Sequence, residues 1–264
     1  MNGPIFSELI DSLKADGPSS WSGTITDNWM QGRTTYGGLS AALCLQAAYL
    51  SYPDLPPLRS ASINFVGPTS GKFKVTTIVL RAGKSVTYIS AELTSSKGLA
   101  THAVLTFGAS RESHFDRTFT KPPQVPQPEQ SEEFLNHGLE PQFLNNFERQ
   151  LASGAMPISA SDKSEHYIWV RHNDQQADNL VALMALADMP PPAVFPMFKE
   201  FAPVSSMNWM MNYLSEDIST EDGWWLMRSA AEHARDGYSS QDMQVWNSRG
   251  ELIITGRQNV AIFY

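Results

Sequence analysis

Cysteine is almost missing from this sequence of 264 residues, which contains only Cys44. A single cysteine excludes a disulfide within the chain. Its place in an Ala- and Leu-rich segment indicates a small buried side chain rather than a nucleophile. The sequence also lacks an apolar run long enough to span a bilayer, and its first residues lack the basic and apolar regions of a signal peptide. We therefore expect a cytoplasmic protein that does not engage a membrane.

Charged residues are scarce, and positive ones are scarcer than negative ones. Charged residues make up 17% of the chain, with 19 Lys and Arg against 27 Asp and Glu, a formal net charge of -8. Because no cluster of Lys and Arg offsets this balance locally, nucleic acid is excluded as a partner. Arg235 and Arg257 could meet the phosphate of a ligand, although a solvent-exposed carboxylate is the commoner partner. Hydrophobic content of 42% is typical of a globular chain of one or two domains.

Several well-known site motifs are missing as well. The sequence has no Gly-x-Ser-x-Gly motif, which argues against a serine hydrolase of that type. Its six histidines include no pair with the helical spacing of metal ligands, so we expect neither a metal nor another cofactor. The segment 67–72 falls one residue short of a phosphate-binding loop and lies between predicted strands.

A strongly apolar helix is predicted just before Asp188. Leu180, Leu183, Met184 and Ala187 repeat at helical spacing, and the other faces are apolar too, which indicates a helix buried on most sides. Asp188 falls next on the same face, and three of the next four residues are prolines that end the helix. A carboxylate in a last helical turn is disfavoured by the helix dipole, so it needs partners. Considered alone, a turn-forming Asp is the commoner interpretation.

The predicted elements occur twice in the same order, a helix followed by a series of strands. In the first half they are a helix at 5–13, a strand at 20–25, a helix at 39–50 after a loop at 31–38, and strands at 60–66, 73–81, 87–95 and 100–107. In the second half they are strands at 143–151 and 166–171, the helix that ends at Asp188, and strands at 206–214, 224–231, 238–246 and 252–263. Short motifs recur in step, such as Ser62-Ile63-Asn64-Phe65 with Ser206-Met207-Asn208-Trp209 and Ser96-Lys97-Gly98 with Ser248-Arg249-Gly250. From this repeat we expect a duplicated unit, whose two copies pair into one pseudo-symmetric body.

Four motifs in order carry a resemblance to a known family: Tyr36-Gly37-Gly38, Ile168-Trp169-Val170-Arg171, Leu186-Ala187-Asp188-Met189 and the segment 250–258. From about Trp21 to Phe263 the chain resembles the TesB-like type II acyl-CoA thioesterases. The resemblance implies an α+β double hotdog, in which two antiparallel sheets, each wrapped around a long central helix, form a pseudo-dimer. The expected domains are an N-terminal hotdog at 1–118, a Pro-rich linker at 119–137 and a C-terminal hotdog at 138–264.

The same resemblance implies a site in which Asp188, Ser206 and Gln258 hold and activate a water. Ser206 stands where the family more often has Thr, and Asn208 stands where an Asp often follows. The hydroxyl is retained, but Ser205 leaves open which of the two serines points inward, because neighbours on a strand face opposite sides.

Thioester hydrolysis needs a base, an oriented water and donors for an oxyanion, and these residue types can supply them. Asp188 is the candidate base, and Ser206 and Gln258 can fix the water beside it. Backbone N–H groups near Gly37 and Gly38 are the candidate oxyanion and substrate contacts, although a Gly pair before a helix is more often only a loop feature. Methionines and tryptophans between 184 and 211 are ordinarily core residues, but they could also line an acyl tunnel.

The sequence therefore predicts an acyl-CoA thioesterase of fatty acid metabolism that releases a free acid and CoA. Two alternatives stay open, a non-catalytic acyl-CoA binding protein and a hotdog enoyl-CoA hydratase. A hydratase would need an Asp and His pair around the second helix, and no such pair is apparent. A homo-oligomer stays open, and the acyl chain length is not specified.

Overall fold

The computed structural model describes residues 3–134 and 140–264, and these divide into two compact units, each discontinuous in sequence. Unit 1 comprises Met1–Arg117, Pro141–Asn146 and Asp174–Asp188. Unit 2 comprises Thr118–Glu140, Phe147–Asn173 and Met189–Tyr264. Residues 135–139, where the predicted linker ends and the predicted C-terminal hotdog begins, lie outside the described residues, as do residues 1–2, the start of the predicted N-terminal hotdog. The predicted domain boundaries stay a prediction.

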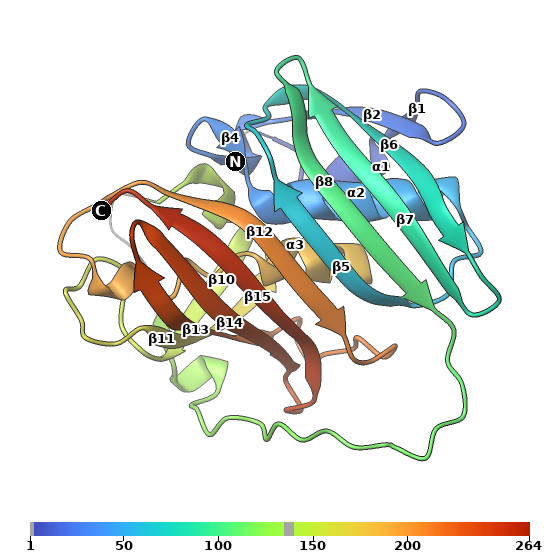
Figure 1. Cartoon of the computed structure of the whole chain (residues 1–264). Coiled ribbons are helices and arrows are strands. Elements are labelled where there is room, and N and C mark those ends of the chain that lie inside the picture. The colour runs from blue at the N-terminus through green and yellow to red at the C-terminus, as the bar shows by residue number, and fades with distance from the viewer. Residues whose placement is uncertain (1–2, 135–139) are drawn as a thin grey trace. The chain divides into compact units, whose positions relative to one another are not determined.

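The sheet of unit 1 is antiparallel throughout, with strand order β1-β2-β6-β7-β8-β5 (Figure 1). Its strands are β1 (Lys14–Ala15), β2 (Ser20–Ile25), β5 (Leu58–Phe65), β6 (Gly71–Ala82), β7 (Val86–Ser95) and β8 (Gly98–Gly108). Along β8 the buried residues Ala103, Leu105 and Phe107 alternate with partly exposed ones, the pattern of a sheet with one face in the core. The sequence predicts β2, β5, β6, β7 and β8 to within two residues at each end, but not the two-residue strand β1.

Two apolar helices pack together in unit 1. The longer is α2 (Gly37–Ser51), which also packs against β2, β6, β7 and β8. Most of its side chains are buried, because its Ala and Leu residues favour a helix and offer no polar face to solvent. The shorter is α3 (Leu180–Ala187), capped by Asn179, whose side-chain oxygen accepts a hydrogen bond from the Ala182 N–H at 3.0 Å. With eight residues, α3 is not the long helix that the family resemblance implies for the second half, because the cap and the prolines after Asp188 limit its length.

The remaining elements of unit 1 are short. They are α1 (Phe6–Asp11), η1 (Asp27–Trp29), the hairpin of β3 (Met30–Gln31) and β4 (Thr34–Thr35), and η3 (Gln142–Asn146). Two of them differ from the sequence predictions. The predicted loop at 31–38 contains the end of β3, all of β4 and the start of α2. The predicted strand at 143–151 begins as the 3-10 helix η3, because Asn146 donates its side-chain N–H to the carbonyl oxygens of Phe143 and Asn28.

The sheet of unit 2 is also antiparallel, with strand order β12-β15-β14-β13-β11-β10-β9 (Figure 1). Its strands are β9 (Glu132–Glu133), β10 (Phe147–Ser153), β11 (Glu165–His172), β12 (Val204–Tyr213), β13 (Trp225–Arg235), β14 (Tyr238–Asn247) and β15 (Leu252–Ile262). Two 3-10 helices, η2 (Pro128–Gln130) and η4 (Phe195–Met197), lie in its connections.

One face of this sheet carries a cluster rich in tryptophan. Trp169, Trp224 and Trp246 pack there with partly buried Val125, and the indole N–H of Trp169 donates to the carbonyl oxygen of Pro126 at 2.8 Å. The Pro-rich segment therefore has apolar and polar contacts on unit 2, although its composition predicts little to bury. The reason is that three large rings leave apolar surface that Val125 can cover. We call the opposite face of this sheet the inner face. It carries the buried polar side chains of Gln241 and Gln258.

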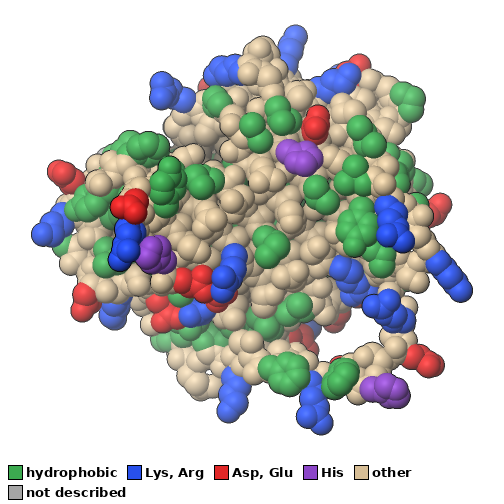
Figure 2. All heavy atoms as spheres, in the orientation of Figure 1, with side chains coloured by type: hydrophobic (Ala, Val, Ile, Leu, Met, Phe, Trp, Pro, Cys, Tyr) green, Lys and Arg blue, Asp and Glu red, His purple; other side chains and the backbone are tan. Residues whose placement is uncertain are grey.

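Charges of both signs are interspersed on the face shown in Figure 2, where Lys and Arg side chains lie among Asp, Glu and apolar ones. In the described part of the chain, no helix combines the length and apolar character that crossing a bilayer requires.

Candidate active site

The carboxylate of Asp188 lies against the first residue of α2. A Cβ atom placed on Gly37 would come 2.6 Å from Oδ2 of Asp188, closer than non-bonded atoms approach. It would also make a tight contact of 3.1 Å with the ring of Phe65. Only glycine leaves room for this carboxylate. Asp188 follows the last turn of α3, where a negative charge is disfavoured, but its carboxylate reaches the positive end of the longer helix α2. The contact supplies the partner that the sequence pattern requires but does not identify.

Gly38 is needed for a different contact. A Cβ there would come 2.3 Å from the carbonyl oxygen of Ala185 and 2.6 Å from the hydroxyl of Tyr36, so α2 and α3 pack backbone to backbone at this point. The Tyr36 hydroxyl donates a hydrogen bond to the same Ala185 oxygen, and its ring stacks on Phe143 at 4.0 Å. Burial and, second, the charge of Asp188 raise the pKa of Tyr36, which keeps this donor protonated.

The two glycines are the first two residues of α2 rather than part of a loop. Both have a packing reason to be glycine, and this reason is independent of any ligand. Their role as substrate and oxyanion contacts through backbone N–H groups stays a prediction.

Ser206 and Gln258 lie on neighbouring strands of unit 2. Gln258 of β15 pairs with Trp209 of β12, and two residues further along β15, Val260 pairs with Ser206. Residues paired across antiparallel strands share a face, so Ser206 lies on the same face as Gln258. Ser205 pairs with Ala261 and therefore belongs to the opposite face. The strand register thus identifies Ser206 as the serine that shares the face of Gln258.

A β-bulge makes this arrangement possible. Ser206 and Trp209 are three residues apart, and in a regular strand they would point to opposite faces. The register of β12 shifts between Ser206 and Asn208, which adds one residue to the strand and returns both side chains to one face. The face they share is the inner face, where Gln258 and Trp209 are almost fully buried and Ser206 is partly exposed.

A second glutamine, Gln241, holds the side chain of Gln258. It lies directly opposite Gln258 on β14, and its Nε2 donates to Oε1 of Gln258 at 2.9 Å. Its own Oε1 accepts a hydrogen bond from the backbone N–H of Ala193 at 2.8 Å. Gln241 is fully buried. Gln241 is not among the residues predicted from the sequence, although a Gln at a buried position of an alternating strand is a signal that could have found it.

Two further polar side chains are buried on the inner face. His166 of β11 and Ser229 of β13 are paired across the strands, and both are fully buried. Within residues 3–134 and 140–264, neither the ring nitrogens of His166 nor the hydroxyl of Ser229 have a hydrogen-bond partner. Burial lowers the pKa of His166 to about 4, because a charged imidazolium would lose its hydration.

The lowered pKa of His166 predicts a loss of stability in acid. In an unfolded chain a histidine takes up its proton near pH 6.5, so the unfolded state binds more protons than the folded state below that pH. The contribution of neutral His166 is fully present above about pH 6.5 and declines as the pH falls toward 4, in total by about 3 kcal/mol. Urea unfolding of the wild type and of His166→Leu at pH 7 and pH 4.5 measures this. We expect a smaller pH dependence in His166→Leu, and equal dependence would refute the assignment.

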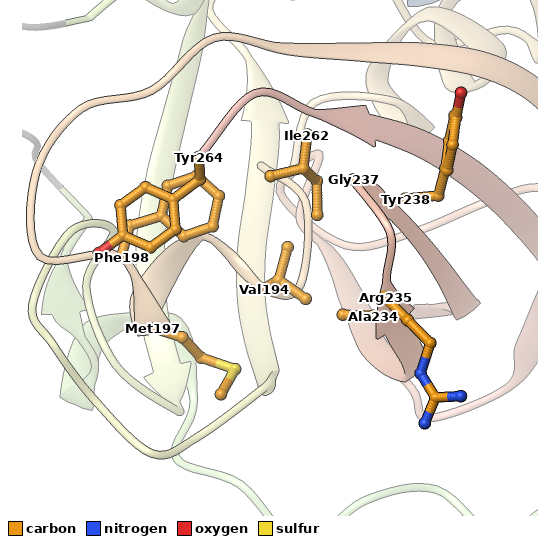
Figure 3. Close-up of a pocket in the computed structure, with 9 residues that line it drawn as sticks. All are labelled: Val194, Met197, Phe198, Ala234, Arg235, Gly237, Tyr238, Ile262 and Tyr264. Atoms are coloured by element: carbon orange, nitrogen blue, oxygen red, sulfur yellow. The ribbon is translucent and has the colours of Figure 1, made fainter.

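A pocket of about 330 Å³ opens in unit 2 (Figure 3). Its floor is apolar, with Val194 and Ile262 between the stacked rings of Phe198 and Tyr264 on one side and Ala234 on the other. Its remaining lining residues are Met197, Arg235, Gly237 and Tyr238. Ile262 lies two residues beyond Val260 on β15, so the pocket continues the inner face past Ser206 and Gln258.

The two arginines that could meet a phosphate differ in their surroundings. Arg257 forms an ion pair with Glu232 at 2.7 Å, the commoner of the two alternatives from the sequence. Arg235 lies at the rim of the pocket, with its guanidinium directed away from Val194 and Ile262 (Figure 3). In the described ranges, no group of three or more His, Cys, Asp and Glu side chains is placed to hold a metal ion. Cys44 is buried, and burial raises the pKa of its thiol to about 12.

The structure thus forms two groups from the five predicted site residues. In unit 1, Asp188 contacts Gly37, and Gly38 is the next residue of α2. In unit 2, Ser206 and Gln258 share the inner face, with Gln241 as an additional member. The residues of each group belong to a single unit.

Comparisons with known proteins extend these observations. Residues 25–108 match the family model of the acyl-CoA thioesterase N-terminal domain, and residues 119–262 match that of the acyl-CoA thioesterase C-terminal domain. A hot dog fold protein from Alicyclobacillus acidocaldarius is similar in structure, with a TM-score of 0.85, 22% identity and 97% of each chain covered. The acyl-CoA thioesterase II TesB2 from Mycobacterium marinum has a TM-score of 0.73 and 16% identity, with 97% of this chain and 98% of that chain covered.

Curated relatives are matched over a shorter stretch. An uncharacterized protein of Mycobacterium bovis is 28% identical over 92 residues, which is 33% of this chain and 32% of the relative. An uncharacterized protein of Mycobacterium tuberculosis gives the same values. The chain therefore spans about a third of the length of the curated relatives it matches.

The structural likenesses define the class of the fold, a hotdog fold with antiparallel sheets and few helices. The family models cover both halves of the sequence, and the chain belongs to the acyl-CoA thioesterase family. The resemblance inferred from the motifs around Gly37, Asp188 and Gln258 is thereby confirmed at the level of the family.

Proposed function

We propose that the protein hydrolyses acyl-CoA to a free acid and CoA, with a water organised by Asp188, Ser206 and Gln258. The observation that carries this proposal is the shared inner face of Ser206 and Gln258, which depends on a bulge at that place in β12. Bulges beside active sites commonly re-aim a side chain. The position of the Asp188 carboxylate against α2 supports its role as a base, because such a charge needs a specific environment.

The proposed reaction proceeds through a tetrahedral intermediate. Asp188 accepts a proton from the water as the water oxygen attacks the thioester carbonyl carbon. Backbone N–H groups at the start of α2, near Gly37 and Gly38, stabilise the oxyanion. When the intermediate collapses, the carbon–sulfur bond breaks, the proton passes from Asp188 to the sulfur, and CoA and the free acid leave. Ser206 and Gln258 fix the water before the attack.

The apolar pocket of unit 2 is our candidate for the acyl group. Its volume of about 330 Å³ falls within the range of small-molecule sites. Met197, one of the methionines that the sequence connects with an acyl tunnel, lines it, and methionine adapts easily to different chains. The same proposal includes the double hotdog with a pseudo-dimeric arrangement, the cytoplasmic location and the place in fatty acid metabolism. It leaves a homo-oligomeric state open.

Release of free CoA thiol tests the function directly. Short, medium, long and aromatic acyl-CoA are offered to the purified full-length chain, and thiol release is followed with binding of the same ligands measured in parallel. We expect release with at least one acyl class. Binding without release would instead favour a non-catalytic acyl-CoA binding protein, and hydration of an enoyl-CoA without thiol release would favour a hydratase.

A further inference from the structure

The orientation of the Gln258 amide is determined by its hydrogen bonds. A backbone N–H can only donate, so the Gln241 atom that meets the N–H of Ala193 at 2.8 Å is the oxygen. The other end of the Gln241 amide, its NH2 group, therefore faces Gln258. Because an NH2 group donates, the Gln258 atom that meets it at 2.9 Å is in turn its oxygen. The backbone N–H of Ala193 thus fixes the orientation of two side-chain amides, first that of Gln241 and through it that of Gln258.

This chain of donors has a consequence for the chemistry of Gln258. Its Oε1 accepts from Gln241, so the Nε2 group, at the other end of the amide, is the donor of this side chain. A donor is what a water oxygen or a carbonyl oxygen of the substrate accepts from. If the amide were reversed, an acceptor would take that place.

We propose that Gln241 is a positioning residue for thioester hydrolysis, which holds Gln258 as a hydrogen-bond donor toward the substrate and the attacking water. This inference rests on the proposed role of Gln258. Gln241 itself is fully buried and acts only through Gln258. Val194, the residue after Ala193, lines the apolar pocket, so the backbone that anchors Gln241 is continuous with the pocket lining.

The sharpest variant is Gln241→Glu. When ionised, the introduced carboxylate has only acceptors, so one oxygen still meets the N–H of Ala193 while the other forces the Gln258 amide to reverse. When protonated, the introduced carboxyl donates to Gln258 as Gln241 does, and the original orientation returns. Burial raises the pKa of the introduced carboxyl above that of a free Glu, so the change between the two forms falls within the pH range in which activity can be measured. We therefore expect reduced kcat at neutral pH and a ratio of variant to wild-type kcat that rises as the pH falls.

Dividing the kcat of the variant by that of the wild type removes the effect of groups that titrate in both proteins, including His166 on the inner face. Gln244→Glu is the matched control, because Gln244 lies on the same strand but on the opposite face, where its Oε1 accepts from Arg228. We expect it to keep the activity and the pH profile of the wild type. A Gln241→Glu profile parallel to that of the wild type would overturn the proposal.

Two further variants keep the test decisive if Gln241→Glu does not fold. Gln241→Met removes the hydrogen bonds at similar volume, and we expect kcat to fall about 10- to 100-fold with little change in KM. Ala193→Pro removes the N–H that anchors Gln241 and places the Cδ of the ring where its hydrogen lay, so the Gln241 amide must also move. Ala193 is the second residue of a turn closed by the hydrogen bond from the Phe195 N–H to the Pro192 oxygen, a position that favours proline. It should lower kcat in the same manner.

A double variant separates this inference from the proposed function. Gln241→Met combined with Gln258→Ala should be no slower than Gln258→Ala alone, because Gln241 works through Gln258. Additive losses would overturn the positioning role. If Gln258→Ala loses activity and the Gln241 variants do not, the positioning role alone fails. If Gln258→Ala keeps full activity, the proposed role of Gln258 fails, and the inference about Gln241 fails with it.

Discussion

Replacing Asp188 with Asn is expected to lower kcat for thioester hydrolysis by about 10²- to 10⁴-fold, the contribution of a general base. The amide has nearly the shape of the carboxylate and still fits beside Gly37, but it cannot accept the proton of the attacking water. KM and the thermal unfolding midpoint should change little. Steady-state release of CoA thiol with the best acyl-CoA measures the effect.

Asp54→Asn is the matched control. Asp54 occupies the corresponding place after α2 in the sequence repeat, but it is exposed. Its replacement should leave kcat unchanged. Wild-type activity in Asp188→Asn would exclude this carboxylate as the base, and equal losses in both variants would point to a general effect of charge.

The second large effect is expected from alanine at the two glycines that begin α2, and the two variants should fail in different ways. In Gly38→Ala the new Cβ meets the backbone oxygen of Ala185 at 2.3 Å, and α2 and α3 must separate to admit it. Overpacking of this kind costs about 1–3 kcal/mol, and a clash with backbone lies at the upper end. We expect a clear drop in the midpoint of thermal or urea unfolding.

In Gly37→Ala the new Cβ instead meets the side-chain carboxylate of Asp188, which can rotate away. The loss of stability should therefore be smaller than in Gly38→Ala, while kcat falls at least tenfold because the base is displaced. Unfolding curves and thiol-release rates on both variants test this contrast. Equal stability losses with unchanged kcat in Gly37→Ala would contradict a functional role for the contact.

Much of the strand pattern is predictable from the sequence, because alternation of apolar and polar residues is a local property. It identified β2, β6, β7 and β8 almost to the residue, and the apolar repeat identified α2 and α3. The prediction of a strand from residue 143 was wrong at its start, because the side-chain hydrogen bonds of Asn146 stabilise the 3-10 helix η3 there. The alternation of apolar and polar residues does not reveal such side-chain hydrogen bonds.

The surroundings of the site residues were less predictable, for a reason specific to each. The choice between Ser205 and Ser206 depends on a bulge, which changes the register by one residue without any mark in the hydrophobic pattern. The partner of Asp188 comes from a helix that begins about 150 residues earlier in the chain. Strand alternation could have marked Gln241 as buried, but its role depends on Ala193 and Gln258, which lie 48 and 17 residues away in the chain.

The order in which unit 1 receives its parts has a consequence for synthesis on the ribosome. Its sheet and α2 are complete by residue 117, but the acceptor of the Tyr36 hydroxyl, Ala185, and the carboxylate beside Gly37 arrive only with α3. Part of unit 2, including Trp169, emerges before α3 does. An N-terminal fragment that ends in the Pro-rich segment would therefore expose the α3-facing side of α2, and a nascent chain must keep that side from aggregating until α3 emerges.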